Sequence, residues 1–177
     1  PILINIALFQ IGWFACVMSG AANQPWIGVS IATVIIAAHI TRASARQKEL
    51  LLILFAMLIG AFWDSLLVWQ NWLDYSSGII VTNTAPYWIV VMWGLFATTL
   101  NISLRWLKHK TIIAAIVGAI AGPLAYYGGV KLGAVQFVDM QMAFISLSVG
   151  WAIFTPVLMY LSNNFDGYPS RLIRSTT

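Results

Sequence analysis

Charged residues are scarce in this sequence. Only 8% of its 177 residues are Asp, Glu, Lys or Arg, whereas 60% are hydrophobic. Soluble domains carry roughly 25% charged residues, so this composition excludes an ordinary soluble domain. The nine basic residues give a net charge of +4, but they are spread along the chain and do not form the basic patch that binds nucleic acid. We therefore expect a membrane protein without a nucleic-acid partner.

Cysteine and histidine are almost absent, which excludes several kinds of site. The single cysteine, Cys16, cannot form an internal disulfide. His39 has no second histidine or cysteine nearby, so no metal site is predicted. The chain also has no G-x-S-x-G nucleophile motif and no glycine-rich phosphate loop. No enzyme class and no cofactor is indicated.

Long hydrophobic runs, in contrast, fill most of the chain. A lipid-spanning helix needs about 20 apolar residues, and the length leaves room for roughly six such helices with short connections. The predicted fold is all-α: residues 1–177 form one domain, a polytopic bundle of about six transmembrane helices. The predicted spans are Ile2–Gly20, Trp26–Thr41, Leu50–Trp72, Pro86–Leu107, Thr111–Gly129 and Val138–Leu161.

The positive charges predict how this bundle lies in a membrane. Basic residues occur at the ends of the second, fourth and sixth spans, which lie on the same side: Arg42, Arg46, Lys48, Arg105, Lys108, Lys110, Arg171 and Arg174. Only Lys131 lies on the other side. Because cytoplasmic loops are enriched in Lys and Arg, both termini are predicted in the cytoplasm, and the chain in the inner membrane of a bacterium.

Asp64 is the most unusual residue, because it stands alone in the apolar stretch LLILFAMLIGAFWDSLLVW. A charge in the middle of a lipid-spanning helix costs roughly 2.5 kcal/mol or more on insertion scales, so such a residue suggests function. Gly60 and Ala61 share its helix face, which is therefore expected to pack against other helices. With no cation predicted nearby except Lys131, we expect a neutral Asp64 that joins helices or binds a head group or a proton.

Other polar and aromatic side chains are expected around Asp64. Together these side chains would line an outward-facing polar cavity with aromatic walls, and Lys131 and Asp139 would flank its mouth. Gln10 needs a partner on another helix, a deep indole needs an acceptor or a ligand, and Asn101 either joins helices or coordinates a ligand. The predicted ligand-binding or proton-binding residues are Asp64, Asn101, Gln10, Trp13, Trp93, Tyr126 and Gln141.

Small residues recur at helical spacing in two spans, a pattern that lets another backbone approach closely. The first span has the spacing Gly12/Cys16/Gly20, which could dock a membrane-protein partner. The fifth span carries a longer stripe that predicts a packing surface: Ala114, Gly118, Gly122, Ala125 and Gly129.

Four segments resemble a known family: FQIGWFACV, WDSLL, PYWIVVMWGLFATTLNISLRWL and AGPLAYYGGVKLGAV. They are similar to those of an uncharacterised family of small bacterial polytopic inner-membrane proteins, a domain-of-unknown-function family, over nearly the whole chain. The family has no established activity to carry over. Its genes often lie beside genes for fatty-acid-modifying methyltransferases, so the resemblance implies a lipid-linked role.

Three functions agree with these observations. The first is a non-catalytic binding or accessory protein for a lipid or other amphiphile, with membrane lipids as its partners. The second is a transport component resembling the substrate-capture subunit of a vitamin importer, which docks through small-residue faces. The third is an intramembrane enzyme that uses Asp64 as an acid or base, although no nucleophile or metal ligand accompanies it. We favour the first.

Overall fold

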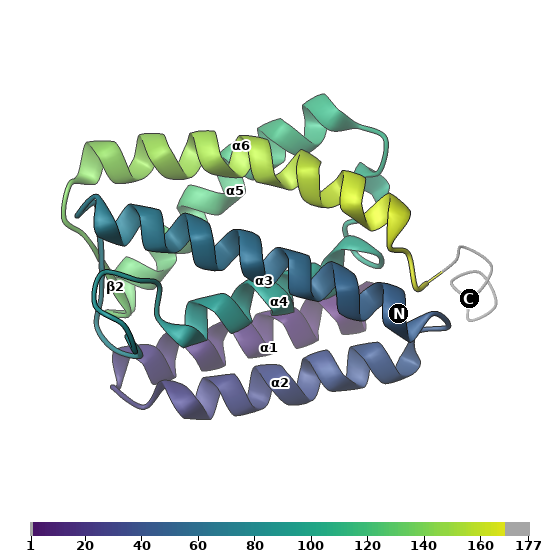
Figure 1. Cartoon of the computed structure of the whole chain (residues 1–177), viewed down its shortest axis with the longest axis horizontal. Helices are drawn as coiled ribbons and strands as arrows, with labels where there is room; N and C mark the ends of the chain where they lie inside the picture. Colours follow the sequence, from purple (N-terminus) through teal and green to yellow (C-terminus); the bar gives the residue numbers. More distant parts are fainter. Residues whose placement is uncertain (1, 169–177) are drawn as a thin grey trace.

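The apolar runs fold into helices, because a helix satisfies its own backbone hydrogen bonds where water is absent. The computed structural model describes residues 2–168. Successive helices run antiparallel, and the start of the first lies at the same end of the bundle as the end of the last (Figure 1). The helices are α1 (Ile2–Ala21), α2 (Pro25–Arg42), α3 (Arg46–Trp69), α4 (Tyr87–Leu100), the 3₁₀ turn η1 (Arg105–Leu107), α5 (Thr111–Lys131) and α6 (Met140–Asn164).

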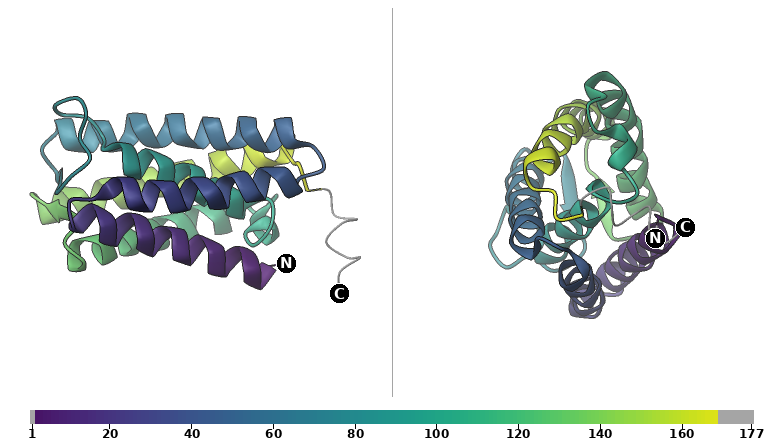
Figure 2. Two further views of the ribbon diagram at one scale, coloured as in Figure 1. Left: turned by 90° about the horizontal axis from the view of Figure 1, so that it is seen from below. Right: turned by 90° about the vertical axis from the view of Figure 1, so that its right-hand side faces the viewer.

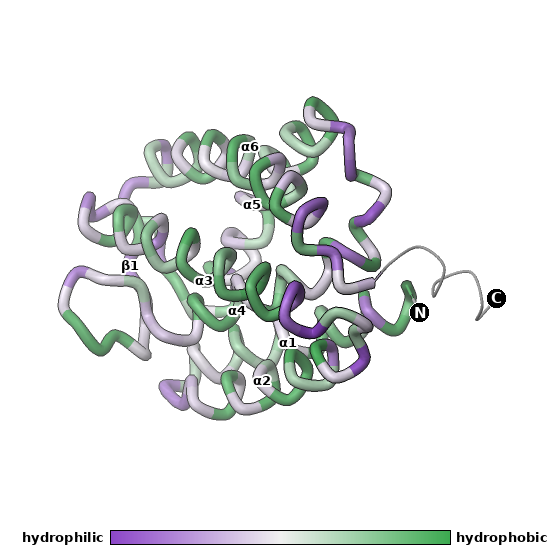
Figure 3. The backbone as a smooth tube through the Cα atoms, turned by 45° about the vertical axis from the view of Figure 1, so that its right-hand side comes forward, coloured by the Kyte–Doolittle hydropathy of each residue, from purple (hydrophilic) through white to green (hydrophobic). Residues whose placement is uncertain are grey.

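This arrangement confirms the predicted all-α fold. Five helices, α1, α2, α3, α5 and α6, are long and apolar enough to cross a membrane. Their outer faces carry exposed side chains such as Leu3, Val34 and Phe62, which would be unfavourable in water. Hydrophobic residues line the helices, whereas many of the hydrophilic ones gather at the two ends of the bundle (Figure 3). The chain is therefore a multi-pass membrane protein.

The fourth predicted span was too long. It was expected to reach Leu107, but α4 has 14 residues and ends at Leu100. Thr98, Thr99 and Asn101 are weak helix formers, so the chain turns here and continues into η1. Most side chains of α4 are buried, and the helix contacts α1, α2, α3 and α6. Because its neighbours shield it from lipid, α4 does not need the length of a complete span.

The basic residues lie together as the sequence predicted. Three of them flank the turn between α2 and α3, and three lie on or just after η1, at the end of the bundle where α1 begins (Figures 1 and 2). Lys131 lies at the end of α5, at the opposite end of the bundle. Arg171 and Arg174 lie outside the described residues. Which end faces the cytoplasm stays a prediction.

Ion pairs hold the segment after α6 against η1. Asp166 accepts from Arg105 at 2.8 Å and from Lys108 at 2.9 Å. Burial raises the pKa of Asp166, but these two cations and the backbone N–H of Tyr168 outweigh it, so the pKa lies below its usual value. The carboxylate therefore stays charged and joins the two segments near neutral pH.

A small antiparallel sheet closes the opposite end. β1 (Leu73–Tyr75) follows α3 and pairs with β2 (Val135–Phe137), which precedes α6. Leu73 lies opposite Phe137, and Tyr75 lies opposite Val135. The sheet places the side chain of Tyr75, which is buried, inside the bundle.

The small-residue stripe of the fifth span is a packing surface at Gly118 and Gly122, whereas Ala125 of the same stripe is exposed. Gly118 of α5 lies against Thr155 and the backbone carbonyl of Trp151, and Gly122 lies against the Trp151 ring. The first span behaves similarly: Gly12 packs on Leu95, and Gly20 lies on the Trp88 ring. These glycines of α1 and α5 are therefore covered by other helices of this chain.

We predict that Gly118→Val lowers the free energy of unfolding by about 1–3 kcal/mol, because the new side chain would overlap backbone atoms of α6. Denaturant unfolding of the purified protein in detergent measures this change. Ala121→Val, on the exposed face of the same helix, is the control and should change stability by less than about 0.5 kcal/mol. Equal stability of the two variants would contradict the close α5–α6 contact.

Candidate functional site

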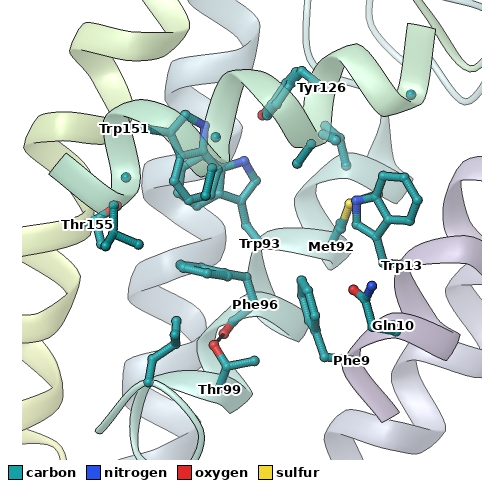
Figure 4. A pocket seen from close by; sticks show the side chains of 18 of the residues that line it. Phe9, Gln10, Trp13, Met92, Trp93, Phe96, Thr99, Tyr126, Trp151 and Thr155 are labelled. Atoms are coloured by element: carbon teal, nitrogen blue, oxygen red, sulfur yellow. Dashed lines mark hydrogen bonds between the residues drawn. The ribbon is translucent and has the colours of Figure 1, made fainter. Parts of the chain in front are cut away.

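An elongated cavity of about 460 Å³ lies between α1, α4, α5 and α6 (Figure 4). Ligand sites for small molecules typically measure roughly 300–1,000 Å³. The cavity begins at Tyr75 and Val135, which belong to the sheet, and extends to Ser103 and Leu107 near the basic end. It follows α4 from Trp88 to Thr99, a distance of roughly 16 Å at 1.5 Å per residue.

The cavity opens sideways between α1 and α5. These two helices make almost no contact with each other, although both line the cavity. Gln10 of α1 and Ala121 and Ala125 of α5 border the gap, and all three are exposed. Toward the sheet, the Trp13 ring reaches Gly128 of α5 and narrows the gap. Because α1 and α5 are long apolar helices, the opening faces the region that lipid would occupy.

Aromatic rings form most of the inner wall. Trp93 of α4 and Trp151 of α6 stack with ring centroids 4.6 Å apart and an interplanar angle of 15°. Phe96 meets Trp151 edge-on at 5.2 Å and Phe9 of α1 at 6.3 Å. These rings make the wall apolar and flat, a surface that suits a hydrocarbon chain or a planar ring.

Asp64 lies directly behind this wall and is fully buried. Its carboxyl accepts hydrogen bonds from the Tyr75 hydroxyl at 2.6 Å, the Trp93 indole N–H at 2.7 Å and the Tyr126 hydroxyl at 2.8 Å. All three partners line the cavity, but Asp64 itself does not. Asp64 therefore orients the wall from behind and does not touch the space inside.

The hydrogen bonds around Asp64 need no cation. An indole N–H can only donate, whereas a phenol can donate or accept, so the network is satisfied by a charged carboxylate and also by a neutral one. Tyr75 belongs to β1, and burial together with the nearby carboxyl holds its pKa well above the usual value. Its phenol therefore remains protonated and available as a donor.

The chain matches the model of one protein family over residues 2–157. That family is described as "Protein of unknown function (DUF2878)". The chain belongs to this family. Membership confirms the resemblance found in the sequence and carries no activity with it. Comparisons with curated proteins and with solved structures gave no match.

Within this family member, the structure separates the predicted site residues into three places. Gln10, Trp13, Trp93 and Tyr126 line the cavity, with Asp64 behind them. Gln141 is exposed in the first turn of α6 and does not line it. Asn101 lies at the end of α4, in a different polar cluster.

The direction and character of the cavity differ from the prediction. An outward-facing polar cavity was expected, but the walls are mainly apolar and the opening is lateral. Lys131 lies over the Tyr127 ring at 5.0 Å, and Asp139 accepts from Met142 N–H as the N-cap of α6, so neither flanks the opening. The polar residues at the helix ends turn outward because they lie where the chain leaves the bundle.

Asn101 belongs to a cluster centred on Glu49, which is fully buried at the basic end of α3. Glu49 accepts from the Asn101 amide at 2.6 Å and from the backbone N–H of Gly167 at 2.8 Å, and its second oxygen lies 2.8 Å from Nε2 of His39. The same amide donates to the carbonyl of Phe165. This cluster joins α2, α3, α4 and the end of α6, so Asn101 connects helices as one of its two sequence interpretations proposed.

Sequence reasoning missed three important residues. Tyr75 and Glu49 lie outside the predicted membrane core, in a loop and at a helix start, so nothing marked them as buried. Trp151 was not assigned to the site. Its stacking on Trp93 depends on how α4 meets α6, which periodicity along one helix does not reveal.

We predict that Asp64→Leu destabilises the protein by at least about 3 kcal/mol, because it leaves three buried donors without a partner, each worth about 1 kcal/mol or more. Asp64→Asn has a similar shape and retains one acceptor oxygen, so it should lower the free energy of unfolding clearly less. Thermal or denaturant unfolding in detergent compares the two variants. If Asp64→Leu proves as stable as the parent chain, the carboxyl does not organise the wall.

Proposed function

We propose that this protein is a non-catalytic binding or accessory protein for a lipid or other amphiphile, held in the cavity between α1, α4, α5 and α6. One observation carries the proposal: the cavity is lined by aromatic and aliphatic side chains and opens sideways between two helices suited to span a membrane. A ligand dissolved in the bilayer could enter it without passing through water.

The shape of the opening supports this route. Ala121 and Ala125 are the residues of α5 that border the gap, and their small side chains leave it open. The lining residues follow α4 from Trp88 to Thr99, so the cavity has room for a lipid chain extended along this helix. Inside, a chain would lie against Phe96 and the stacked pair Trp93 and Trp151.

The position of Asp64 favours binding over catalysis. An acid or base must come within hydrogen-bond reach of the substrate atom that it protonates or deprotonates. Both oxygens of Asp64 are occupied by Tyr75, Trp93 and Tyr126, and these rings separate the carboxyl from the cavity. In our proposal Asp64 is therefore a positioning residue.

The importer-like alternative depended on docking through Gly12, Cys16 and Gly20. Cys16 is fully buried, and the two glycines lie against Leu95 and Trp88 of α4. A partner subunit could not reach this face without displacing the chain's own helices. We therefore propose binding, and not transport, as the first candidate function.

We predict that Ala125→Phe, which would fill the gap between α1 and α5, lowers the amount of co-purifying lipid roughly tenfold, equivalent to about 1.4 kcal/mol of binding free energy. Native mass spectrometry of the purified protein measures the bound lipid. The matched control is Ala37→Phe, on the exposed face of α2 away from the cavity, which should leave binding unchanged. Equal lipid on both variants, or none on the parent chain, would count against the proposal.

We also propose that the basic end of the bundle faces the cytoplasm of a bacterial inner membrane. The test uses a Cys16→Ala background, because the chain has no other cysteine. A membrane-impermeant maleimide should label Thr82→Cys, in the loop before α4, in intact cells, and should label Ser44→Cys, between α2 and α3, only after permeabilisation. The opposite labelling pattern would reverse the orientation.

A further inference from the structure

We propose that the ligand is an uncharged lipid with one carbonyl or hydroxyl group, and that the side-chain amide of Gln10 binds this group. The inference rests on the proposed function and specifies its ligand. Three observations carry it: the described residues that line the cavity include no charged residue, Gln10 makes no hydrogen bond with another described residue, and the hydroxyls of Tyr75 and Tyr126 are already bonded to Asp64.

The absence of charge in the walls selects the ligand. Among the described residues that line the cavity there is no Asp, Glu, Lys, Arg or His. Moving an ionised group from water into apolar surroundings is very unfavourable unless an opposite charge compensates it. A phosphate or carboxylate inside this cavity would meet only aromatic rings, aliphatic chains and a few neutral polar groups. The part of the ligand that lies inside is therefore neutral.

Gln10 lies near the middle of α1, a helix of 20 residues that is apolar enough to span a membrane. Its side chain is exposed and makes no hydrogen bond with any other described residue. Figure 4 shows it on the α1 side of the cavity, between Phe9 and Trp13. In hydrocarbon, an amide without a partner is costly, and lipid tails offer none. A ligand group at the opening would satisfy it.

The chemistry of the amide defines the group that it binds. A glutamine side chain offers two N–H donors and one carbonyl acceptor, so it pairs with a carbonyl, which accepts, or with a hydroxyl, which does both. A purely hydrocarbon ligand would leave the amide unpaired. An anionic head group would gain only a neutral donor, which does not replace the water or cations that it gives up.

Three hydroxyl groups of the wall already have partners within the chain. The hydroxyls of Tyr75 and Tyr126 are bonded to Asp64, and the Thr99 hydroxyl donates to the carbonyl of Phe96. The Thr155 hydroxyl and the Trp151 indole N–H have no hydrogen-bond partner among the described residues, but both are buried where α6 packs on Gly118 and Gly122 of α5, so neither is exposed at the opening. Gln10 is the polar side chain at the opening, so the ligand's polar group should lie there and its chain should extend along α4.

Fluorescence quenching tests this inference on the full chain in detergent, because Trp13, Trp93 and Trp151 line the cavity. Bromine atoms quench indole fluorescence on contact. Four probes share one brominated chain: a fatty alcohol, a methyl ester, an ionised fatty acid and an alkane. We expect the alcohol and the ester to bind about fivefold to tenfold more tightly than the alkane, the gain expected of one or two hydrogen bonds, and more tightly still than the anion.

Two variants assign this preference to Gln10. Gln10→Leu and Gln10→Met should bind all the neutral probes equally, and both place an apolar side chain at an exposed position, where folding should be retained. Thr33→Val, which removes an exposed polar side chain from α2 away from the cavity, should keep the preference of the parent chain.

The outcomes separate the two proposals. If the neutral probes quench equally and the Gln10 variants behave like the parent chain, the cavity binds lipid but the role of Gln10 is wrong. If the ionised fatty acid binds most tightly, the uncharged ligand is wrong. If no probe quenches the parent chain more than it quenches Ala125→Phe, the cavity does not bind lipid at all, and the proposed function fails.

Discussion

The carboxyl of Asp64 has to be surrounded by donors, and this requirement organises the membrane core of the protein. It has no contact with solvent or lipid, so hydrogen bonds from within the bundle must compensate its burial. The donors come from three separate segments: Tyr75 on β1, Trp93 on α4 and Tyr126 on α5. Asp64 on α3 thereby joins elements that are distant in the sequence.

The cavity follows from the way in which α5 and α6 join the other helices. α5 packs mainly on α6, whereas α1 packs on α2 and α4, so α1 and α5 are left apart. The α5–α6 pair is held to the rest by α6 contacts with α3 and α4, by the β1–β2 pairing, and by the Tyr126–Asp64 bond. The space that remains beside α4 is bordered by aromatic rings on one side and by small residues of α5 on the other.

Large rings and glycines are paired throughout the interior. Trp93 lies against Gly60, Trp151 against Gly122, and Trp63 against Gly150. Lipid gives no hydrophobic driving force for helices to associate, so this close packing and a few buried hydrogen bonds must hold them together. The packing also fixes the rings of Trp93 and Trp151 in the wall of the cavity.

The membrane class, the six helices, the grouping of basic residues at one end and the packing of Gly118 and Gly122 of α5 can be predicted from the sequence. These features follow from local composition and helical spacing, which act within one segment at a time. The sequence also identified Asp64, Gln10, Trp13, Trp93 and Tyr126 as unusual, because polar and indole groups in apolar runs need partners. Whether each of them finds a partner, and which one, depends on how the helices pack. In the structure α4 ends earlier than predicted, Asn101 belongs to the Glu49 cluster, and Gln141 is exposed. The tertiary structure also brings Tyr75 from a loop to Asp64, because a contact between distant segments depends on how whole helices pack, and no pattern within a single helix contains that information.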